Sequence, residues 1–135
     1  MANDRRLSQI TQQLKALPLP PETIEVSSHA AVGLLAGNGN HCDYFVGAVY
    51  RSQSSEEDIL KHYQGRQFQN PVQDRLEEWD ITILKDQDTF KSLYLPCHFD
   101  TPEAWGLTAQ SYSSGTVYFV HAMRSYAANG DFRCH

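Results

Sequence analysis

The spacing of the apolar residues changes at a group of prolines, and this change limits the chain to a fold with both helix and sheet. From Leu7 to Leu17 apolar residues recur every three or four positions, which is the period of an amphipathic helix. Three prolines within positions 18–21 then end that helix, because proline has no amide hydrogen to donate. From Thr23 to Leu34 apolar and polar residues alternate, as a half-buried strand requires.

An Asn-Gly pair follows the alternating segment and predicts a β-hairpin. The pair lies within Gly37-Asn38-Gly39-Asn40, and both of its residues tolerate the positive φ of a tight turn. The next segment, Cys42 to Tyr50, is apolar on both faces and is typical of an interior strand. A glycine-rich loop can also hold a phosphate, but such a loop precedes a helix, and the residues after Asn40 continue as a strand.

The rest of the chain predicts a second helix and four further strands. A capping-box pattern at 54–58 begins a short helix, and Gly65 ends it. Residues 66–79 fit either a loop or an irregular turn of helix. Strands are expected at Ile81–Leu84, Leu93–Phe99, Leu107–Tyr112 and Thr116–Tyr126, the last of them interior because it is apolar on both faces.

This order of elements predicts the α+β class, with a mainly antiparallel sheet of about five or six strands and two short helices on one face. Residues 1–135 are expected to form a single globular domain, since no repeat or linker divides them. A domain of 135 residues buries enough of its surface to fold without a metal or a disulfide, and its hydrophobic fraction of 41% is ordinary for a globular protein.

Charge and hydropathy exclude several classes of partner. The net charge is −5 and the eleven basic residues are scattered, whereas nucleic-acid binding uses clustered lysines and arginines, so no nucleic acid is expected. The apolar runs are about seven residues long, too short for a spanning helix of about 20, so no membrane is expected. The N-terminus lacks the apolar region of a secretory signal, which predicts a cytoplasmic protein, exported only if a native signal has been removed.

Each of the three cysteines has a histidine as its immediate neighbour. Thiolate and imidazole groups bind zinc and also act as nucleophile and base, so these residues are candidates for either chemistry. The candidate zinc ligands are Cys42, Cys97 and Cys134, followed by His41, His98 and His135. The candidate catalytic residues are Cys97, His121 and His98, with Cys97 and His121 as the favoured nucleophile–base pair. The alternatives are buried thiols that pack as small apolar groups, or one disulfide with a spare thiol in an exported protein.

The function predicted from these features is that of a non-enzymatic module that binds a protein or a small molecule without a cofactor, with a homodimer as one option. Trp105, in an expected loop between Pro102 and Gly106, is the candidate ligand-binding residue, because indole offers a large contact area and a polar edge. The alternative is a metal-binding or thiol-dependent Cys/His protein with zinc as its cofactor. A hydrolase or isomerase that uses His98 and Asp100 is a third hypothesis.

Overall fold

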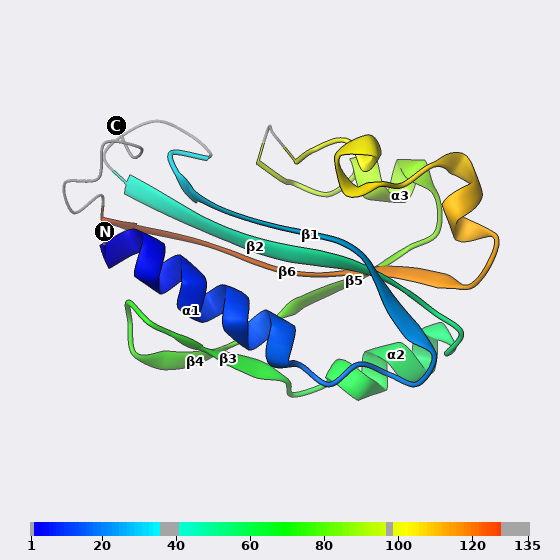
Figure 1. The fold of residues 1–135 in the computed structure, drawn as a ribbon, viewed down its shortest axis with the longest axis horizontal. Coiled ribbons are helices and arrows are strands. Elements are labelled where there is room, and N and C mark those ends of the chain that lie inside the picture. Colours follow the sequence, from blue (N-terminus) through cyan, green and yellow to red (C-terminus); the bar gives the residue numbers. More distant parts are fainter. Residues whose placement is uncertain (1, 36–40, 97–98, 128–135) are drawn as a thin grey trace.

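The computed structural model describes residues 2–35, 41–96 and 99–127, and these residues form an α+β fold (Figure 1). The main sheet has four antiparallel strands in the order β1-β2-β6-β5. The bounds of these strands are Thr23–Gly33 for β1, His41–Ser52 for β2, Asp80–Leu84 for β5 and Thr116–Ala127 for β6. A separate two-stranded sheet consists of β3, Gln67–Asn70, and β4, Arg75–Glu78.

Helices cover both faces of the main sheet. The α-helices are α1, Ala2–Ala16, α2, Glu56–Tyr63, and α3, Gln87–Lys91, and two short 3₁₀ helices follow as η1, Pro102–Trp105, and η2, Ala109–Tyr112. Figure 1 shows α1, α2 and the small sheet on one side of the main sheet and α3 on the other. Two apolar clusters correspond to these two layers, one with α1 and α2 and one with α3 and η1.

The interior strand pair of β2 and β6 supplies both clusters. The two strands pair along twelve residues, from His41 opposite Ala127 to Ser52 opposite Thr116. Along β2, side chains such as Tyr44 point into the first cluster and the alternate ones, such as Phe45, into the second. The prediction that both segments form interior strands is confirmed.

The register places Gly47 in close contact with two aromatic rings. A Cβ atom added to Gly47 would lie 3.0 Å from Cζ of Phe119 and 3.1 Å from Cζ of Phe45. Gly47 lies between His29 on β1 and His121 on β6, its two cross-strand neighbours. The missing side chain therefore lets two aromatic rings pack directly on the backbone of the central strand.

Several predictions made from local patterns are confirmed. Strands β1 and β2 pair antiparallel as expected, although the turn residues Gly37-Asn38-Gly39-Asn40 lie outside the described residues. Ser55 is the N-cap of α2, and its hydroxyl accepts a hydrogen bond from the backbone N–H of Asp58 at 3.2 Å. The α+β class is confirmed as well, with four strands in the main sheet and two in the small one.

Other predictions made from local patterns are wrong. The described part of Leu93–Phe99 contains no strand, and Leu107–Tyr112 contains the helix η2 instead of a strand. Ser111 explains the second case, because its hydroxyl accepts a hydrogen bond from the Thr108 N–H at 2.8 Å and so caps a helical turn. Residues 66–79, expected as loop or helix, hold the hairpin β3–β4, and α3 adds a third helix on the second face.

The close packing over Gly47 predicts the result of enlarging this residue. Gly47→Val should lower the free energy of unfolding by about 1–3 kcal/mol, because the new methyl groups overlap the rings of Phe119 and Phe45. The measurement is urea denaturation followed by circular dichroism. Gln67→Val on the exposed surface of β3 is the control and should change stability by less than about 0.5 kcal/mol. Equal effects of the two substitutions would contradict the packing described here.

Candidate functional site

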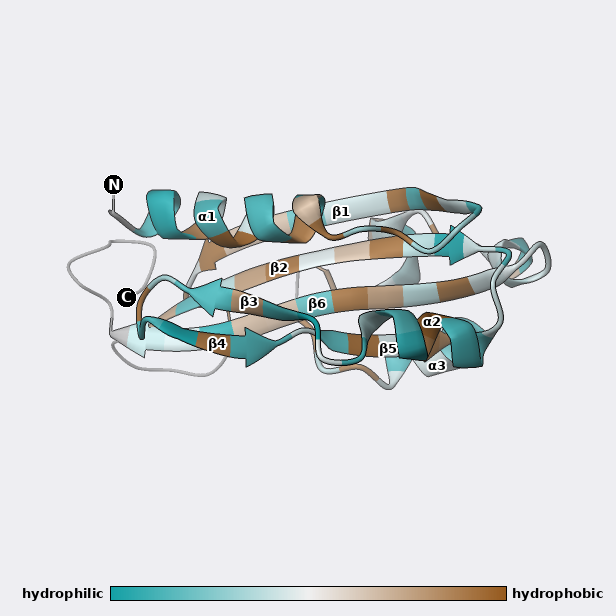
Figure 2. Ribbon diagram, turned by 90° about the horizontal axis from the view of Figure 1, so that it is seen from below, coloured by the Kyte–Doolittle hydropathy of each residue, from teal (hydrophilic) through white to brown (hydrophobic). Residues whose placement is uncertain are grey.

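The outer edge of β1 is the most extended unpaired backbone surface of the main sheet. This edge, called the β1 edge here, runs along Thr23–Gly33, and no strand in the described part of the chain pairs with it. Figure 2 shows β1 at the upper margin of the sheet, beside α1. Ile24 is 52% exposed on this strand. Unpaired N–H and C=O groups on a long edge can pair with a further strand.

One charged side chain of helix α1 bonds to two residues of β1. Nζ of Lys15 donates to Oε1 of Glu25 at 2.6 Å and to Oγ of Ser28 at 2.8 Å, and both acceptors lie on β1. Ile10 and Leu14 of the same helix are buried against the sheet. The ion pair is partly exposed and contributes little to stability, so its main effect is to position α1.

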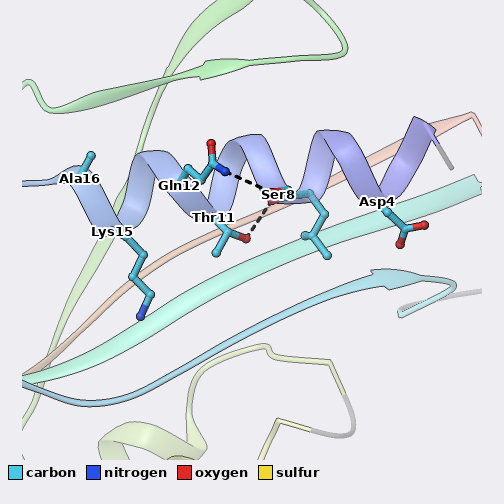
Figure 3. A pocket seen from close by; sticks show the side chains of 7 residues that line it. Asp4, Ser8, Thr11, Gln12, Lys15 and Ala16 are labelled. Carbon is cyan, nitrogen blue, oxygen red and sulfur yellow. Dashed lines mark hydrogen bonds between the residues drawn. The ribbon is translucent and has the colours of Figure 1, made fainter.

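A hollow of about 480 Å³ runs along α1 on the side of Lys15, and we call it the α1 hollow (Figure 3). Its lining combines apolar groups with hydroxyl, amide and charged groups. The lining residues are Asp4, Leu7, Ser8, Thr11, Gln12, Lys15 and Ala16. Figure 3 shows Lys15 extending from the helix in the direction of the sheet. The α1 hollow can therefore receive both apolar and polar side chains of a bound segment.

The opposite flank of α1 contacts the small sheet. The side-chain amide of Gln13 donates to the carbonyl of Gln69 at 2.9 Å and accepts from its N–H at 2.6 Å. The amide thus bonds to the edge of β3 as a neighbouring strand would. These two hydrogen bonds fix α1 on the side away from β1.

Two side chains of β1 bond to η1, which lies on the face of the sheet opposite α1. Oγ of Ser27 donates to the carbonyl of Trp105 at 2.6 Å, and Nε2 of His29 donates to the carbonyl of Ala104 at 2.7 Å. Both carbonyls belong to η1. The backbone of β1 is therefore held from both faces of the sheet. None of the described strands pairs with its outer edge.

Trp105 does not lie on the surface, and the expectation that it does is wrong. Its side chain is 0% exposed, and its Nε1 donates to the carbonyl of Phe99 at 2.8 Å. The ring packs edge-on against Phe119, with 4.8 Å between centroids. The loop expected around it is the 3₁₀ helix η1, capped by Thr101, and this helix turns the indole into the core. Trp105 therefore contributes packing beneath η1.

A buried carboxylate orients one of the predicted histidines. Asp43 is 0% exposed and accepts hydrogen bonds from the Leu35 N–H at 2.9 Å, from Nδ1 of His41 at 3.0 Å and from Oγ of Ser125. Because Nδ1 of His41 donates, the neutral imidazole presents the lone pair of Nε2, as in many general bases and metal ligands. Ser125 bonds to the carboxylate instead of the imidazole, so the three residues do not form a nucleophilic triad.

Sequence reasoning named His41 but missed Asp43 and Ser125. The signal for Asp43 is the spacing of two along a strand, which places His41 and Asp43 on the same face. Ser125 could not have been found in this way, because it lies opposite Asp43 only through the pairing of β2 with β6.

Cys42, one of the predicted zinc ligands, is disulfide-bonded and buried. As a disulfide sulfur it is neither a thiolate ligand nor a nucleophile. Its partner and the other Cys–His candidates lie outside the described residues; these candidates are Cys97, His98, Cys134 and His135. Among the residues that the structure describes, no group of three His, Cys, Asp or Glu side chains could hold a metal ion.

His121, the predicted catalytic base, lies in the second apolar layer. Its ring stacks on Phe119 with 4.5 Å between centroids, and Nδ1 is buried without a hydrogen-bond partner in the described part of the chain. Burial lowers the pKa of His121, the charge of Asp80 opposes this shift and that of Arg124 adds to it. The imidazole is therefore neutral at neutral pH. Its pairing with Cys97 stays a prediction.

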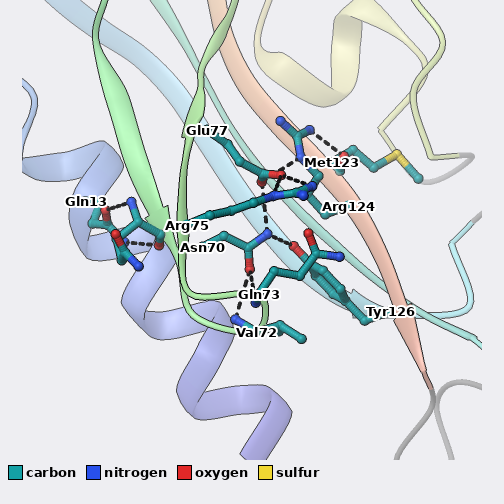
Figure 4. A network of polar contacts seen from close by, with 10 residues as sticks. Gln13, Asn70, Val72, Gln73, Arg75, Glu77, Met123, Arg124 and Tyr126 are labelled. Carbon is teal, nitrogen blue, oxygen red and sulfur yellow. Dashed lines mark hydrogen bonds and ion pairs between the residues drawn. The ribbon is translucent and has the colours of Figure 1, made fainter.

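A polar network attaches the small sheet to β6, and no local pattern predicted it (Figure 4). The fully buried amide of Asn70 donates to Oε2 of Glu77 at 2.9 Å and to the hydroxyl of Tyr126. Its carbonyl oxygen accepts from the backbone N–H of Val72 at 2.9 Å, which forms the turn of the hairpin. Glu77 also accepts from Nε of Arg124 at 2.9 Å.

The hydrogen bonds of this network determine the charge state of Glu77. Burial alone would raise the pKa of its carboxyl group, but hydrogen bonds from Asn70, Arg75 and Arg124 outweigh burial and hold the pKa below the ordinary 4.5. Since the pKa is lower in the folded than in the unfolded chain, the resulting stability is present above the ordinary pKa. It is lost as the pH falls through the folded pKa.

Glu77→Gln tests this contribution. At neutral pH the substitution should lower the free energy of unfolding by about 1–3 kcal/mol, because a partly buried acceptor for Arg124 loses its charge. The difference between wild type and variant should shrink as the pH is lowered to about 3 in urea denaturation. Glu78→Gln, at the exposed neighbouring position, should have a small effect at both pH values. A difference that does not depend on pH would contradict the assignment.

The disulfide predicts the number of free thiols. The chain has three cysteines, so one disulfide leaves one thiol per chain. Titration of the unreduced, denatured protein with a thiol reagent should give one thiol, and titration after reduction should give three. Three thiols before reduction would contradict the disulfide and restore Cys42 as a candidate ligand. Elemental analysis of the same sample tests the zinc alternative directly.

The comparisons with known proteins give no family. No family model, no curated protein and no solved structure matches this chain. In the described part of the chain, no helix is long and apolar enough to cross a membrane. The function therefore has to be argued from the geometry of the chain itself.

Proposed function

We propose that this domain is a non-enzymatic binding module that takes an extended segment of a protein along the β1 edge. The observation that carries the proposal is the eleven-residue β1 edge, which lies at the end of the sheet order beside the α1 hollow. An edge strand next to a helix is a geometry that proteins use to bind peptides by strand addition. Main-chain hydrogen bonds then give affinity, and alternate side chains give specificity.

The surroundings of the β1 edge support binding without large rearrangement. Lys15 on one face and the bonds of Ser27 and His29 to η1 on the other already hold the strand. A strand that is fixed before binding loses little conformational entropy on binding. An added segment would direct every second side chain to the α1 side of the sheet, where the α1 hollow lies.

The charges on and around the β1 edge indicate what kind of segment can bind there. Within Ser27–Gly33 no residue carries a carboxylate, an ammonium or a guanidinium group, and the charges of Lys15 and Glu25 compensate each other. The whole chain carries −5, which disfavours an acidic segment. The β1 edge therefore suits an uncharged or weakly basic extended segment with small side chains.

The Cys/His alternative rests on one observation, the orientation of His41 by Asp43. The disulfide at Cys42 removes the first of its predicted ligands. Metal sites need three or four ligands, and His41 has no further ligands beside it among the described residues. A single oriented imidazole therefore does not make a metal site. We therefore place the binding module first.

Selection of peptides tests the proposal. Random peptides displayed on phage are selected against the immobilised full chain, and the enriched peptides are added to isotope-labelled protein. Amide hydrogen exchange should slow along β1, because its outward N–H groups become bonded. Ala30→Lys, at an exposed position of β1, should weaken peptide binding about tenfold, since a long charged side chain blocks strand addition.

The control for this variant carries the same charge change elsewhere. Gln110→Lys lies at an exposed position of η2, which packs beside β6, and should leave peptide affinity unchanged. Enriched peptides that protect other segments while β1 exchanges as before would refute the proposal.

A further inference from the structure

We infer that the segment that occupies the β1 edge is β1 of a second copy of this chain, so that two copies form one continuous antiparallel sheet. This inference rests on the proposed function and names the partner for the same edge. Two identical strands that pair antiparallel are related by a two-fold axis, which is the usual symmetry of a homodimer.

The bulge in β1 determines where such an axis can lie. The register of β1 against β2 shifts between Glu25 and Ser27, so the strand is regular only over Ser27–Gly33. A bulge increases the local twist and turns the preceding residues away from a flat neighbour. The middle of the regular stretch is Ala30. With the axis there, Ala30 faces its own copy.

The pairs that this axis creates fit without conflict. His29 faces Ala31, Ser28 faces Val32 and Ser27 faces Gly33 of the other copy. Every pair contains at least one small residue, and no pair brings two like charges together. The polar ends of Ser27 and His29 are already bonded to carbonyls of η1, so pairing leaves neither of them without a partner.

The two edges of the main sheet differ in the way expected if only one of them pairs. At the other edge, β5 is five residues long, begins with Asp80 and is followed by the exposed Lys85. Short length and flanking charge are common ways in which proteins prevent edge pairing. The stretch Ser27–Gly33 has neither a fixed charge nor a proline, and Ala30 in its middle is exposed. The sequence protects β5 and leaves β1 open.

Charge makes the association sensitive to salt. The junction itself is locally neutral, because Lys15 is paired with Glu25. The two chains nevertheless carry −5 each and repel one another at long range. Added salt screens this repulsion, so the dimer should become tighter between about 0.05 and about 0.5 M salt.

A charge exchange at the axis tests the inference. Ala30→Lys and Ala30→Glu each place two like charges across the axis and should weaken the dimer about tenfold or more in sedimentation velocity. An equimolar mixture of the two variants should dimerise more tightly than either variant alone, because a lysine then faces a glutamate. Gln110→Lys, with the same charge change on η2, should leave the dimer unchanged. Circular dichroism and urea denaturation confirm that each variant is folded.

The outcomes separate the inference from the proposed function. A wild-type chain that stays monomeric at every concentration and salt level would overturn the inference. Peptides that protect β1 in that monomer would still support the proposed function. A wild-type dimer unaffected by both Ala30 variants, or variants that do not restore each other, would also overturn the inference. A tighter dimer in the mixture of the Ala30→Lys and Ala30→Glu variants, together with slow amide hydrogen exchange along β1, would support both the inference and the proposed function.

Discussion

The twelve-residue pairing of β2 with β6 is the interaction on which the rest of the structure depends. β2 is buried on both faces and so is β6 along residues 117–120, so each apolar layer packs on side chains that this pair provides. Tyr44 and Phe45 are neighbours in sequence and lie in different layers. With the pair in the middle of the sheet, β1 and β5 necessarily become its edges. The unpaired β1 edge is thus a consequence of where the most apolar strands lie.

Features set by local sequence were predictable, and those set by distant contacts were not. The helix before the prolines, the cap at Ser55 and the alternation in β1 each depend on residues a few positions apart. The hairpin β3–β4 depends on Asn70, which folds the turn and bonds to Tyr126 at a distance of 56 residues in sequence. No periodicity carries that information. The two missed 3₁₀ helices are an exception, because they depend on local caps, at Thr101 in an expected loop and at Thr108 in an expected strand.

The candidate site was harder to predict than the fold for the same reason. An edge is defined by strand order, and strand order follows from the pairing of β2 with β6 across about 75 residues of chain. Trp105 has the composition of a recognition residue and lies in the core, because η1 turns its indole inward. Cys42 and His41 are one of the three Cys–His pairs, and in the structure Cys42 is disulfide-bonded while His41 donates to the buried Asp43. The metal or thiol chemistry predicted from the three Cys–His pairs stays a prediction, because Cys97, His98, Cys134 and His135 lie outside the described residues.

The same contacts that hold β1 in place also restrict how it can pair. A shift of the axis to His29 brings the bulged residues before Ser27 opposite the end of the strand, and a shift to Ala31 shortens the regular pairing. The bulge bends those residues out of the plane, so their N–H and C=O groups cannot reach a flat neighbour. At the other end Gly33 closes the strand. The bonds of Ser27 and His29 to η1 keep the intervening stretch from adapting to a different register. One bulge and two hydrogen bonds thus favour the symmetric arrangement centred on Ala30, which pairs the whole regular stretch.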